Sequence, residues 1–185
     1  MSEISNETAD FNLALISDDE SLVRTCIEVA QTNLAQSASE YLLGDSALPH
    51  VTLCQFQTTS EKLSVIWSAV CKMHLDRILV RFNHIYISAH KGKHWVGLSV
   101  EGNDELSKLQ QTIFETLGEL GIAGTTLPQT YFPHLTWAQC DKTKTINISV
   151  IPSAEFWQKE YSFRLSLGRS DPNGVYHEVL FGGSS

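Results

Sequence analysis

Two histidines and two threonines recur at the same spacing in this chain of 185 residues. Residues 49–55 read Pro-His-Val-Thr-Leu-Cys-Gln, and residues 133–139 read Pro-His-Leu-Thr-Trp-Ala-Gln. Pro, His, Thr and Gln match in register, and the positions flanking each Thr are apolar in both stretches. A single His-x-Thr triplet is a weak motif, but a match of this extent indicates that both stretches have the same role.

The chemistry of these residue types points to phosphate. If each stretch is a β-strand, side chains two positions apart share a face, so His50 lies beside Thr52 and His134 beside Thr136. An imidazole gains or loses a proton near neutral pH, and a threonine hydroxyl donates a hydrogen bond to a phosphoryl oxygen without ionising. Two such strands facing one cleft would place a phosphodiester between two imidazoles.

Proton transfer explains why two histidines are needed. Hydrolysis of a P–O bond requires one group that takes a proton from water and another that protonates the departing oxygen. We expect His134 to activate water and His50 to protonate the leaving oxygen, although the near symmetry of the two stretches also allows the reverse order. A metal would need a third or fourth ligand, and neither stretch brings an Asp, a Glu or a second His at nearby spacing. The sequence therefore predicts catalysis without a metal or other cofactor.

A strand and a helix are expected to position the first stretch. Residues 11–16 form an apolar run typical of a buried strand. Ser17 and Glu20 fit a capping box, in which the hydroxyl and the carboxylate bond the free amides at a helix start. Apolar residues at three- and four-residue steps from Leu22 to Leu34 then predict one buried helix face.

The middle and the end of the chain predict two more helices and further strands. Ser60 can cap the second helix, and the third is expected to begin at Asn103 and to end at Gly121. Strands are expected over residues 77–82, 84–89 and 95–100, and a closing strand pair over residues 161–168 and 175–182.

The two halves of the chain show the same order of elements. His134 follows His50 by 84 residues (134 − 50), and the same shift carries residues 11–16 onto residues 95–100. Each half reads as a strand, a helix, a loop ending in Pro, and a strand that opens with His-x-Thr. We predict a flexible tail over residues 1–10 and a single bilobal domain with two internal repeats over residues 11–185.

Composition restricts the possible partners. The net charge is −8 and the 13 Lys and Arg residues are scattered, whereas proteins that grip long nucleic acids show a cationic face. We therefore expect a small nucleotide or a short RNA as substrate, and no long duplex. Lys91, Lys93 and His94 lie close enough in sequence to form one basic edge of a cleft, although such lysines are more often solvated turn residues.

The sequence also predicts a cytoplasmic protein that does not associate with membranes. No apolar run approaches the length of a membrane span, and the first residues lack the basic and apolar pattern of a signal peptide. The four cysteines, at positions 26, 54, 71 and 140, are isolated, which favours reduced thiols over disulfides or a zinc site.

With these paired motifs in two matching halves, the chain resembles the 2H phosphoesterase superfamily. That group includes 2′-5′ RNA ligase-like proteins, 2′,3′-cyclic nucleotide phosphodiesterases and 2′-5′ oligoadenylate phosphodiesterases. The resemblance implies a bilobal α+β fold with a pseudo-twofold axis, in which two antiparallel sheets surround a central cleft and helices lie outside. It also implies that His50 and His134 are catalytic, that Thr52 and Thr136 bind the phosphate, and that no metal takes part.

Aromatic and cysteine residues near the motifs are further candidates. Tyr131 and Phe132 precede the second motif, where a ring could stack on a base at the cleft mouth or pack at its rim. By alternation Cys54 would share the face of the first His and Thr, but the second motif has Ala138 there, so the thiol is not part of the repeated chemistry. Trp137 replaces a smaller aliphatic residue common in the family, which we attribute to packing. The remaining histidines, at positions 74, 84, 90, 94 and 177, are expected to be surface or structural.

The sequence thus predicts a metal-independent phosphodiesterase that acts on a small nucleotide or an oligonucleotide end, at a 2′,3′-cyclic phosphate or a 2′-5′ linkage. Three alternatives stay open: ligation of RNA ends through a 2′-5′ bond, cleavage of a cyclic oligonucleotide second messenger, and binding of RNA or a nucleotide without catalysis. Ligation would use the same acid and base in the reverse direction.

Overall fold

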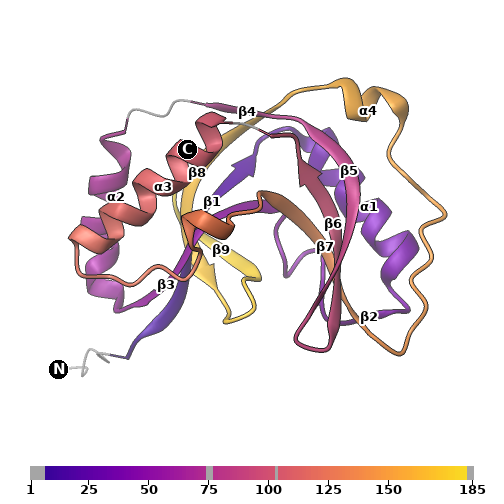
Figure 1. The fold of residues 1–185 in the computed structure, drawn as a ribbon, viewed down its shortest axis with the longest axis horizontal. Helices are drawn as coiled ribbons and strands as arrows, with labels where there is room; N and C mark the ends of the chain where they lie inside the picture. The colour runs from indigo at the N-terminus through magenta and orange to yellow at the C-terminus, as the bar shows by residue number, and fades with distance from the viewer. Residues whose placement is uncertain (1–6, 74–76, 103, 183–185) are drawn as a thin grey trace.

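Two antiparallel sheets make up the framework of the protein, of which the computed structural model describes residues 7–73, 77–102 and 104–182. The sheets face each other (Figure 1), and the predicted α+β architecture is confirmed. The first sheet has the order β3 (His50–Thr58), β1 (Ala9–Ser17), β8 (Tyr161–Ser170) and β4 (Ile78–Val80), with β9 (Tyr176–Phe181) also paired to β8. The second has the order β2 (Ala38–Leu42), β7 (His134–Asp141), β6 (Lys93–Val100) and β5 (Phe82–His90).

Each long helix packs against the sheet that does not contain its preceding strand. Helix α1 (Glu20–Leu34) follows β1 but packs against β2 and β7, and α3 (Asp104–Glu119) follows β6 but packs against β3. Helix α2 (Leu63–Cys71) lies against α3 on the same outer side (Figure 1). Because each sheet is covered by a helix from the other half, the two halves form one packed unit. The remaining short helices are η1 (Ser60–Lys62), η2 (Pro128–Thr130) and α4 (Ala154–Gln158).

The apolar faces of the two motif strands form part of the core, as alternation predicts. Val51 and Leu53 of β3 and Leu135 and Trp137 of β7 are fully buried, and they belong to one hydrophobic cluster that extends across both sheets and the helices. Burial of each such side chain contributes on the order of 1.5–3 kcal/mol. The packing of these side chains holds the opposite, polar faces of β3 and β7 in place.

The strand pairing follows the offset of 84 residues. Strands β1 and β6 begin at Ala9 and Lys93, and each pairs antiparallel with the motif strand of its own half, β3 or β7. On the other side of β7 lies β2, and the corresponding edge of β3 carries an isolated bridge between Phe56 and Gly124. The pseudo-twofold relation therefore includes the neighbours of both motif strands.

The expected boundary between the tail and the folded domain is wrong. Strand β1 begins at Ala9, so residues 9 and 10 belong to the first sheet and not to a tail; residues 1–6 lie outside the described part. Asp10 pairs with Gln57, whose Nε2 donates to Asp10 Oδ1 at 2.9 Å, and this pairing extends the strand beyond the apolar run.

The start of α1 also differs from the expected capping box. Asp19 is the N-cap, and its carboxylate accepts from the amides of Ser21 at 2.9 Å and Leu22 at 3.1 Å. Ser17 stays in β1 through its pairing with Phe163, and its hydroxyl donates to the Ser162 carbonyl at 2.9 Å. The sheet therefore keeps Ser17 in the strand and moves the cap two residues along the chain.

The other element boundaries shift by a few residues. Ser60 opens the short η1 helix instead of capping α2, which begins at Leu63. The strand expected over residues 77–82 is limited to β4, and Asn103, the expected start of the third helix, lies outside the described residues. Gly121 follows α3 with φ +70°, the left-handed conformation that commonly ends a helix. Within the described residues, no helix is both long and apolar enough to cross a membrane.

Candidate active site

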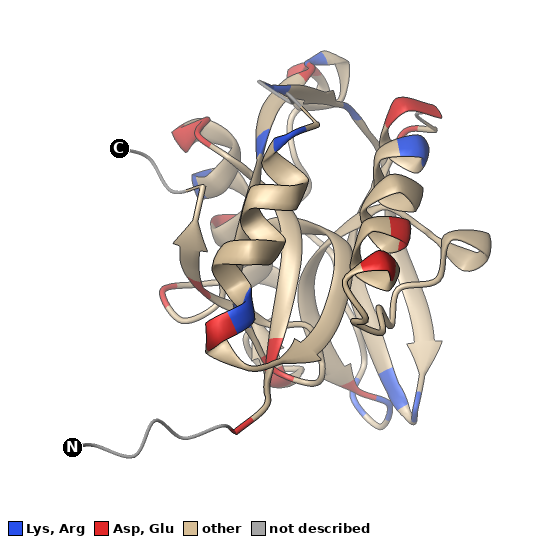
Figure 2. Ribbon diagram, turned by 90° about the vertical axis from the view of Figure 1, so that its left-hand side faces the viewer, with Lys and Arg blue, Asp and Glu red and all other residues tan. Residues whose placement is uncertain are grey.

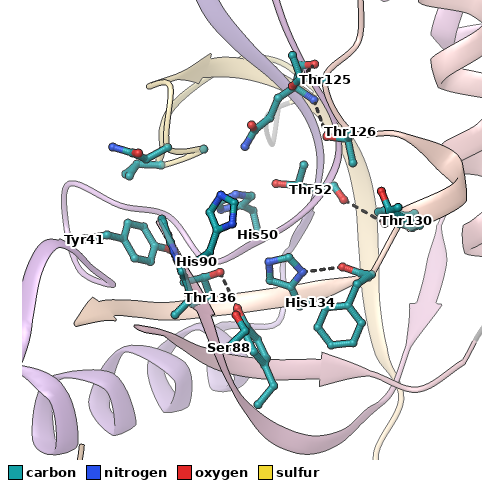
Figure 3. A pocket seen from close by; sticks show the side chains of 18 of the residues that line it. Tyr41, His50, Thr52, Ser88, His90, Thr125, Thr126, Thr130, His134 and Thr136 are labelled. Atoms are coloured by element: carbon teal, nitrogen blue, oxygen red, sulfur yellow. Dashed lines mark hydrogen bonds between the residues drawn. The ribbon is translucent and has the colours of Figure 1, made fainter. Parts of the chain in front are cut away.

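The polar faces of β3 and β7 meet at a cavity of about 390 Å³. His50, Thr52, His134 and Thr136 all line it, together with residues of β5, the segment 125–132 and the turn 173–175. Figure 3 shows the two imidazoles turned toward the same space. Among the described residues that line this inner cleft, no Lys, Arg, Asp or Glu is present. A ligand in the inner cleft would therefore meet neutral hydrogen-bonding groups, aromatic rings and imidazoles.

Both histidines are held in the same way. His50 Nδ1 lies 2.8 Å from the Leu48 carbonyl oxygen, and His134 Nδ1 lies 2.6 Å from the Phe132 carbonyl oxygen. A carbonyl only accepts, so Nδ1 carries a proton in each ring and Nε2 of the neutral imidazole keeps its lone pair. Each histidine opens its strand and bonds the residue two positions earlier, which gives both rings the tautomer of a general base.

Burial disfavours the protonated form of both imidazoles in the free protein. His50 is only 6% exposed, and this burial lowers its pKa from 6.5 to about 4. The hydrogen bond to the Leu48 carbonyl raises the pKa and only partly offsets the effect of burial. A charge on His134 would lower the pKa of His50 further, and the Gly174 carbonyl raises it. Burial also lowers the pKa of His134, opposed by the Phe132 carbonyl. An anion bound between the rings would restore proton affinity to both.

The hydroxyl of Thr52 is oriented by Asn12, a residue of β1. Asn12 Nδ2 donates to Thr52 Oγ1 at 3.0 Å, and an amide nitrogen does not accept. The hydroxyl proton of Thr52 is therefore left to donate to a ligand. The sequence reasoning missed Asn12, although a polar residue inside the apolar run of residues 11–16 was a signal; its side chain is fully buried.

Thr136 has a different partner. Its Oγ1 lies 2.9 Å from the hydroxyl of Tyr86 on β5, and either oxygen can donate. Burial raises the pKa of Tyr86, so this hydroxyl stays protonated. The edge of the Tyr86 ring also contacts His134, with centroids 5.1 Å apart and planes at 78°. Tyr86 thus supports both motif side chains of the second half, and no pattern in the sequence indicated it.

Two further tyrosines brace the motif strands in matching fashion. Tyr131 donates its hydroxyl to the Thr52 carbonyl at 3.0 Å, and Tyr41 of β2 donates to the Thr136 carbonyl, also at 3.0 Å. Both rings line the inner cleft. Each tyrosine hydroxyl therefore holds a motif strand at the carbonyl of the threonine whose side chain lines the cleft.

A model of the 2′-5′ RNA ligase superfamily matches residues 19–167. The chain belongs to this superfamily. The resemblance to 2H phosphoesterases that the paired motifs indicated is therefore confirmed. No curated protein matches the chain significantly.

Solved structures share the fold of this superfamily member. Escherichia coli LigT in complex with 3′-AMP aligns with a TM-score of 0.70 at 15% identity, over 94% of this chain and 96% of LigT. A structure described as a phosphoesterase aligns with a TM-score of 0.63 at 14% identity, over 94% and 96% of the two chains. The PDE domain of MHV ns2 aligns with a TM-score of 0.52 at 13% identity, over 93% and 99%. At these identities the likeness concerns the fold.

Of the two aromatic candidates, Tyr131 and Phe132, Phe132 has the more accessible ring. Phe132 is 47% exposed and stacks on His134, with centroids 5.4 Å apart and planes at 20°. Tyr131 is more buried and packs against the core. Both line the inner cleft, but Phe132 has the exposed face that a nucleobase could cover.

A register shift overturns the expectation for Cys54. Leu13 pairs with Cys54 and Ala14 with Thr52, so Leu53 has no partner on β1; in the same way Trp137 has none on β6. Such a bulge interrupts the alternation of side chains. Cys54 is consequently fully buried and does not line the cleft, and the next residue, Gln55, lines it instead.

The other histidines have mixed positions. His90, at the end of β5, lines the inner cleft, contrary to the expectation that it is only a surface or structural residue. His84, His94 and His177 are not among the described residues that line it. His74 lies outside the described residues. Within the described part of the chain, no three His, Cys, Asp or Glu side chains converge as a metal site.

Proposed function

We propose that this protein is a metal-independent phosphodiesterase that hydrolyses a small nucleotide or an oligonucleotide end, at a 2′,3′-cyclic phosphate or a 2′-5′ linkage. The observation that carries the proposal is the matched pair of imidazoles, each bonded through Nδ1 to a backbone carbonyl, in one cleft with two threonine hydroxyls. Membership of the 2′-5′ RNA ligase superfamily, and a fold shared with LigT and a PDE domain, support phosphodiester chemistry.

The proposed reaction uses one imidazole as base and one as acid. His134 Nε2 takes a proton from water as the water oxygen bonds to phosphorus, and protonated His50 gives its Nε2 proton to the departing oxygen as the P–O bond breaks. Thr52 and Thr136 donate hydrogen bonds to the nonbridging oxygens, where negative charge develops. Afterwards His134 releases its proton to solvent and His50 regains one.

The assignment of His50 as the acid keeps the order predicted from the sequence, and the reverse order stays open because burial lowers the pKa of both imidazoles. The Gly174 carbonyl favours the protonated ring, as does the Leu48 carbonyl. Burial opposes protonation in the free protein, and the negative charge of a bound phosphodiester offsets this effect. For His134 burial likewise lowers the pKa, and the Phe132 carbonyl raises it.

Substrates with different leaving groups test these roles. A nitrophenyl ester leaves without protonation, so His50→Ala should retain far more activity on a nitrophenyl nucleotide diester than on a 2′,3′-cyclic nucleotide. His134→Ala should be impaired on both, by roughly 10²–10⁴-fold. The opposite pattern would reverse the roles.

A chelator and a double variant test the proposal as a whole. Hydrolysis of 2′,3′-cyclic nucleotides or 2′-5′ oligoadenylates should proceed at full rate in excess chelator. The His50→Ala, His134→Ala protein should be inactive while its thermal unfolding stays cooperative. Full activity of this double variant, or an intact substrate panel after hours with wild-type protein, would refute the proposal; the latter with tight binding would favour a noncatalytic binder.

The family match and the likeness to LigT favour one further activity, 2′-5′ ligation. In this reaction the 5′-hydroxyl of one RNA end takes the place of water and attacks a 2′,3′-cyclic phosphate. One imidazole takes the hydroxyl proton, the bond between phosphorus and the 3′ oxygen breaks, and the other imidazole protonates that oxygen, so that a 2′-5′ linkage forms without release of water. Incubation of concentrated RNA ends with wild-type protein, followed by a search for 2′-5′ junctions, tests this activity.

The charge distribution fits a small substrate. Figure 2 shows basic and acidic residues scattered over several elements. With a net charge of −8, the protein has little electrostatic attraction for a long duplex.

A further inference from the structure

A second, larger cavity adjoins the inner cleft. This outer groove has a volume of about 1030 Å³, and both cavities share Gln55, His90, Trp95, Thr125 and Asn173 in their linings. The inner cleft, at about 390 Å³, is near the lower end of the usual range for ligand pockets, and the outer groove is near its upper end. The shared lining residues place the two cavities side by side.

The glutamines of the repeated motif have no part in the proposed reaction. Gln55 and Gln139 are the last residues of the two matching stretches, and both line the outer groove. The bulges at Leu53 and Trp137 cause this placement, because one extra residue in each strand returns the glutamine to the face of the preceding Thr. The repeat therefore places two amides outside the catalytic groups.

The side-chain amides of the two glutamines have different neighbours. Gln139 Oε1 accepts from the Ser39 hydroxyl at 3.0 Å, which directs the amide and leaves Nε2 to donate elsewhere. The Gln55 amide lies directly against Gly174, where an added Cβ would collide with it. Amide side chains both donate and accept, as the edges of nucleobases do.

Both basic and acidic residues line the outer groove. Lys91 and Lys93, at the turn between β5 and β6, are the Lys and Arg residues that line it within the described chain. Asp10, Glu40 and Asp171 also line it. A phosphate would be attracted to the lysines and repelled by the carboxylates, which can instead accept hydrogen bonds from amino or hydroxyl groups. This mixture fits a nucleotide with its phosphate at the β5–β6 turn better than a free anion.

We propose that the outer groove is a subsite for a second nucleotide, so that the preferred substrate is an oligonucleotide of at least two residues with its scissile phosphate between His50 and His134. The next phosphate meets Lys91 and Lys93, and the base meets Gln55, Gln139 and the ring of Trp95, which lies at the junction of the cavities. This inference rests on the proposed function, and it excludes a cyclic mononucleotide as the best substrate.

A charge-removing double variant tests the subsite. In Lys91→Ala, Lys93→Ala protein, kcat/KM for a 2′-5′-linked adenylate trimer should fall by roughly 5–30-fold, and the salt dependence of KM should weaken. Hydrolysis of 2′,3′-cyclic AMP should change by less than about twofold, because this substrate ends within the inner cleft. The matched control is Lys62→Ala, Lys72→Ala, which removes the same charge from exposed positions beside α2. Equal effects on trimer and cyclic nucleotide, or no effect on either, would overturn the inference.

A binding assay separates failure of the subsite from failure of the proposed function. The His50→Ala, His134→Ala protein should bind a fluorescent 2′-5′ adenylate trimer, and further substitution of Gln55→Ala or of both groove lysines should weaken that binding by at least fivefold. If wild-type protein cleaves no phosphodiester but the trimer still binds in this lysine-dependent way, the catalytic proposal fails and the subsite stands. If cleavage occurs without lysine-dependent binding, only the subsite fails.

Discussion

Replacement of Asn12 by Asp should reverse the direction of one hydrogen bond in the cleft while keeping the shape of the side chain. The wild-type amide donates to Thr52 Oγ1 at 3.0 Å and leaves the hydroxyl proton available for the proposed phosphate contact. An ionised carboxylate only accepts, so the Thr52 hydroxyl would donate to it and turn its proton away from the substrate. Asn12→Leu is the matched control, because it removes the amide without adding an acceptor.

The two variants should differ clearly in kcat. Loss of one donor to a developing charge costs about 2.7–4 kcal/mol, or roughly 10²–10³ in kcat, which is the decrease we expect for Asn12→Asp. In Asn12→Leu the Thr52 hydroxyl loses only its orienting partner. This loss should cost about 1 kcal/mol of transition-state stabilisation, which lowers kcat roughly five- to tenfold. Asn12 is fully buried and its Oδ1 has no partner within the described structure, so the Leu variant should fold with little loss of stability.

Steady-state kinetics with a 2′-5′ adenylate oligomer at pH 8, alone and combined with Thr52→Val, provide the assay. Asn12→Asp should have little further effect in the Thr52→Val protein, because the hydroxyl it redirects is already absent. Its deficit relative to wild type should also shrink at lower pH, since a protonated carboxyl can donate to Thr52 as the amide does. Equal kcat for Asn12→Asp and Asn12→Leu, or full additivity with Thr52→Val, would refute the orientation argument.

Three further predictions concern stability and substrate contact. The free energy of unfolding should be highest above pH 6.5 and fall by up to about 3 kcal/mol as pH decreases toward 4, because folding lowers the pKa of His50 from 6.5 to about 4; denaturant titrations of wild type and His50→Asn should show this part lost in the variant. Phe132→Ala should raise KM for nucleotides by roughly 5–100-fold through loss of base stacking, with little change for a substrate without a base; equal effects on both would contradict stacking. Tyr131→Phe and Tyr41→Phe should each lower the free energy of unfolding by about 0.5–1.5 kcal/mol through loss of a strand-bracing hydrogen bond, and an unchanged denaturation midpoint would argue against that brace.

The residues of the proposed catalytic site could be predicted to share a cleft, because their placement depends on local geometry. His50 and Thr52 are two residues apart in one strand, as are His134 and Thr136, and the structure brings all four to one cleft. The same alternation predicted the apolar core faces. Alternation gave the wrong face for Cys54, two residues after Thr52. The bulge at Leu53 causes this change, and a bulge depends on pairing with another strand.

The partners of these groups could not be predicted, because they come from distant parts of the chain. Asn12 reaches Thr52 across 40 residues and Tyr86 reaches Thr136 across 50, and their contacts exist only after the strands have paired. Burial, which lowers the pKa of His50, is likewise a property of the packed protein.

The sequence by itself determined which side chains recur and which face of each strand they share, since backbone alternation is set within a few residues. The tertiary structure alone decided what each of them contacts, which way the Thr52 proton points, and that the repeated glutamines line an outer groove. These features depend on the register between strands and on the exclusion of water, which no local stretch specifies.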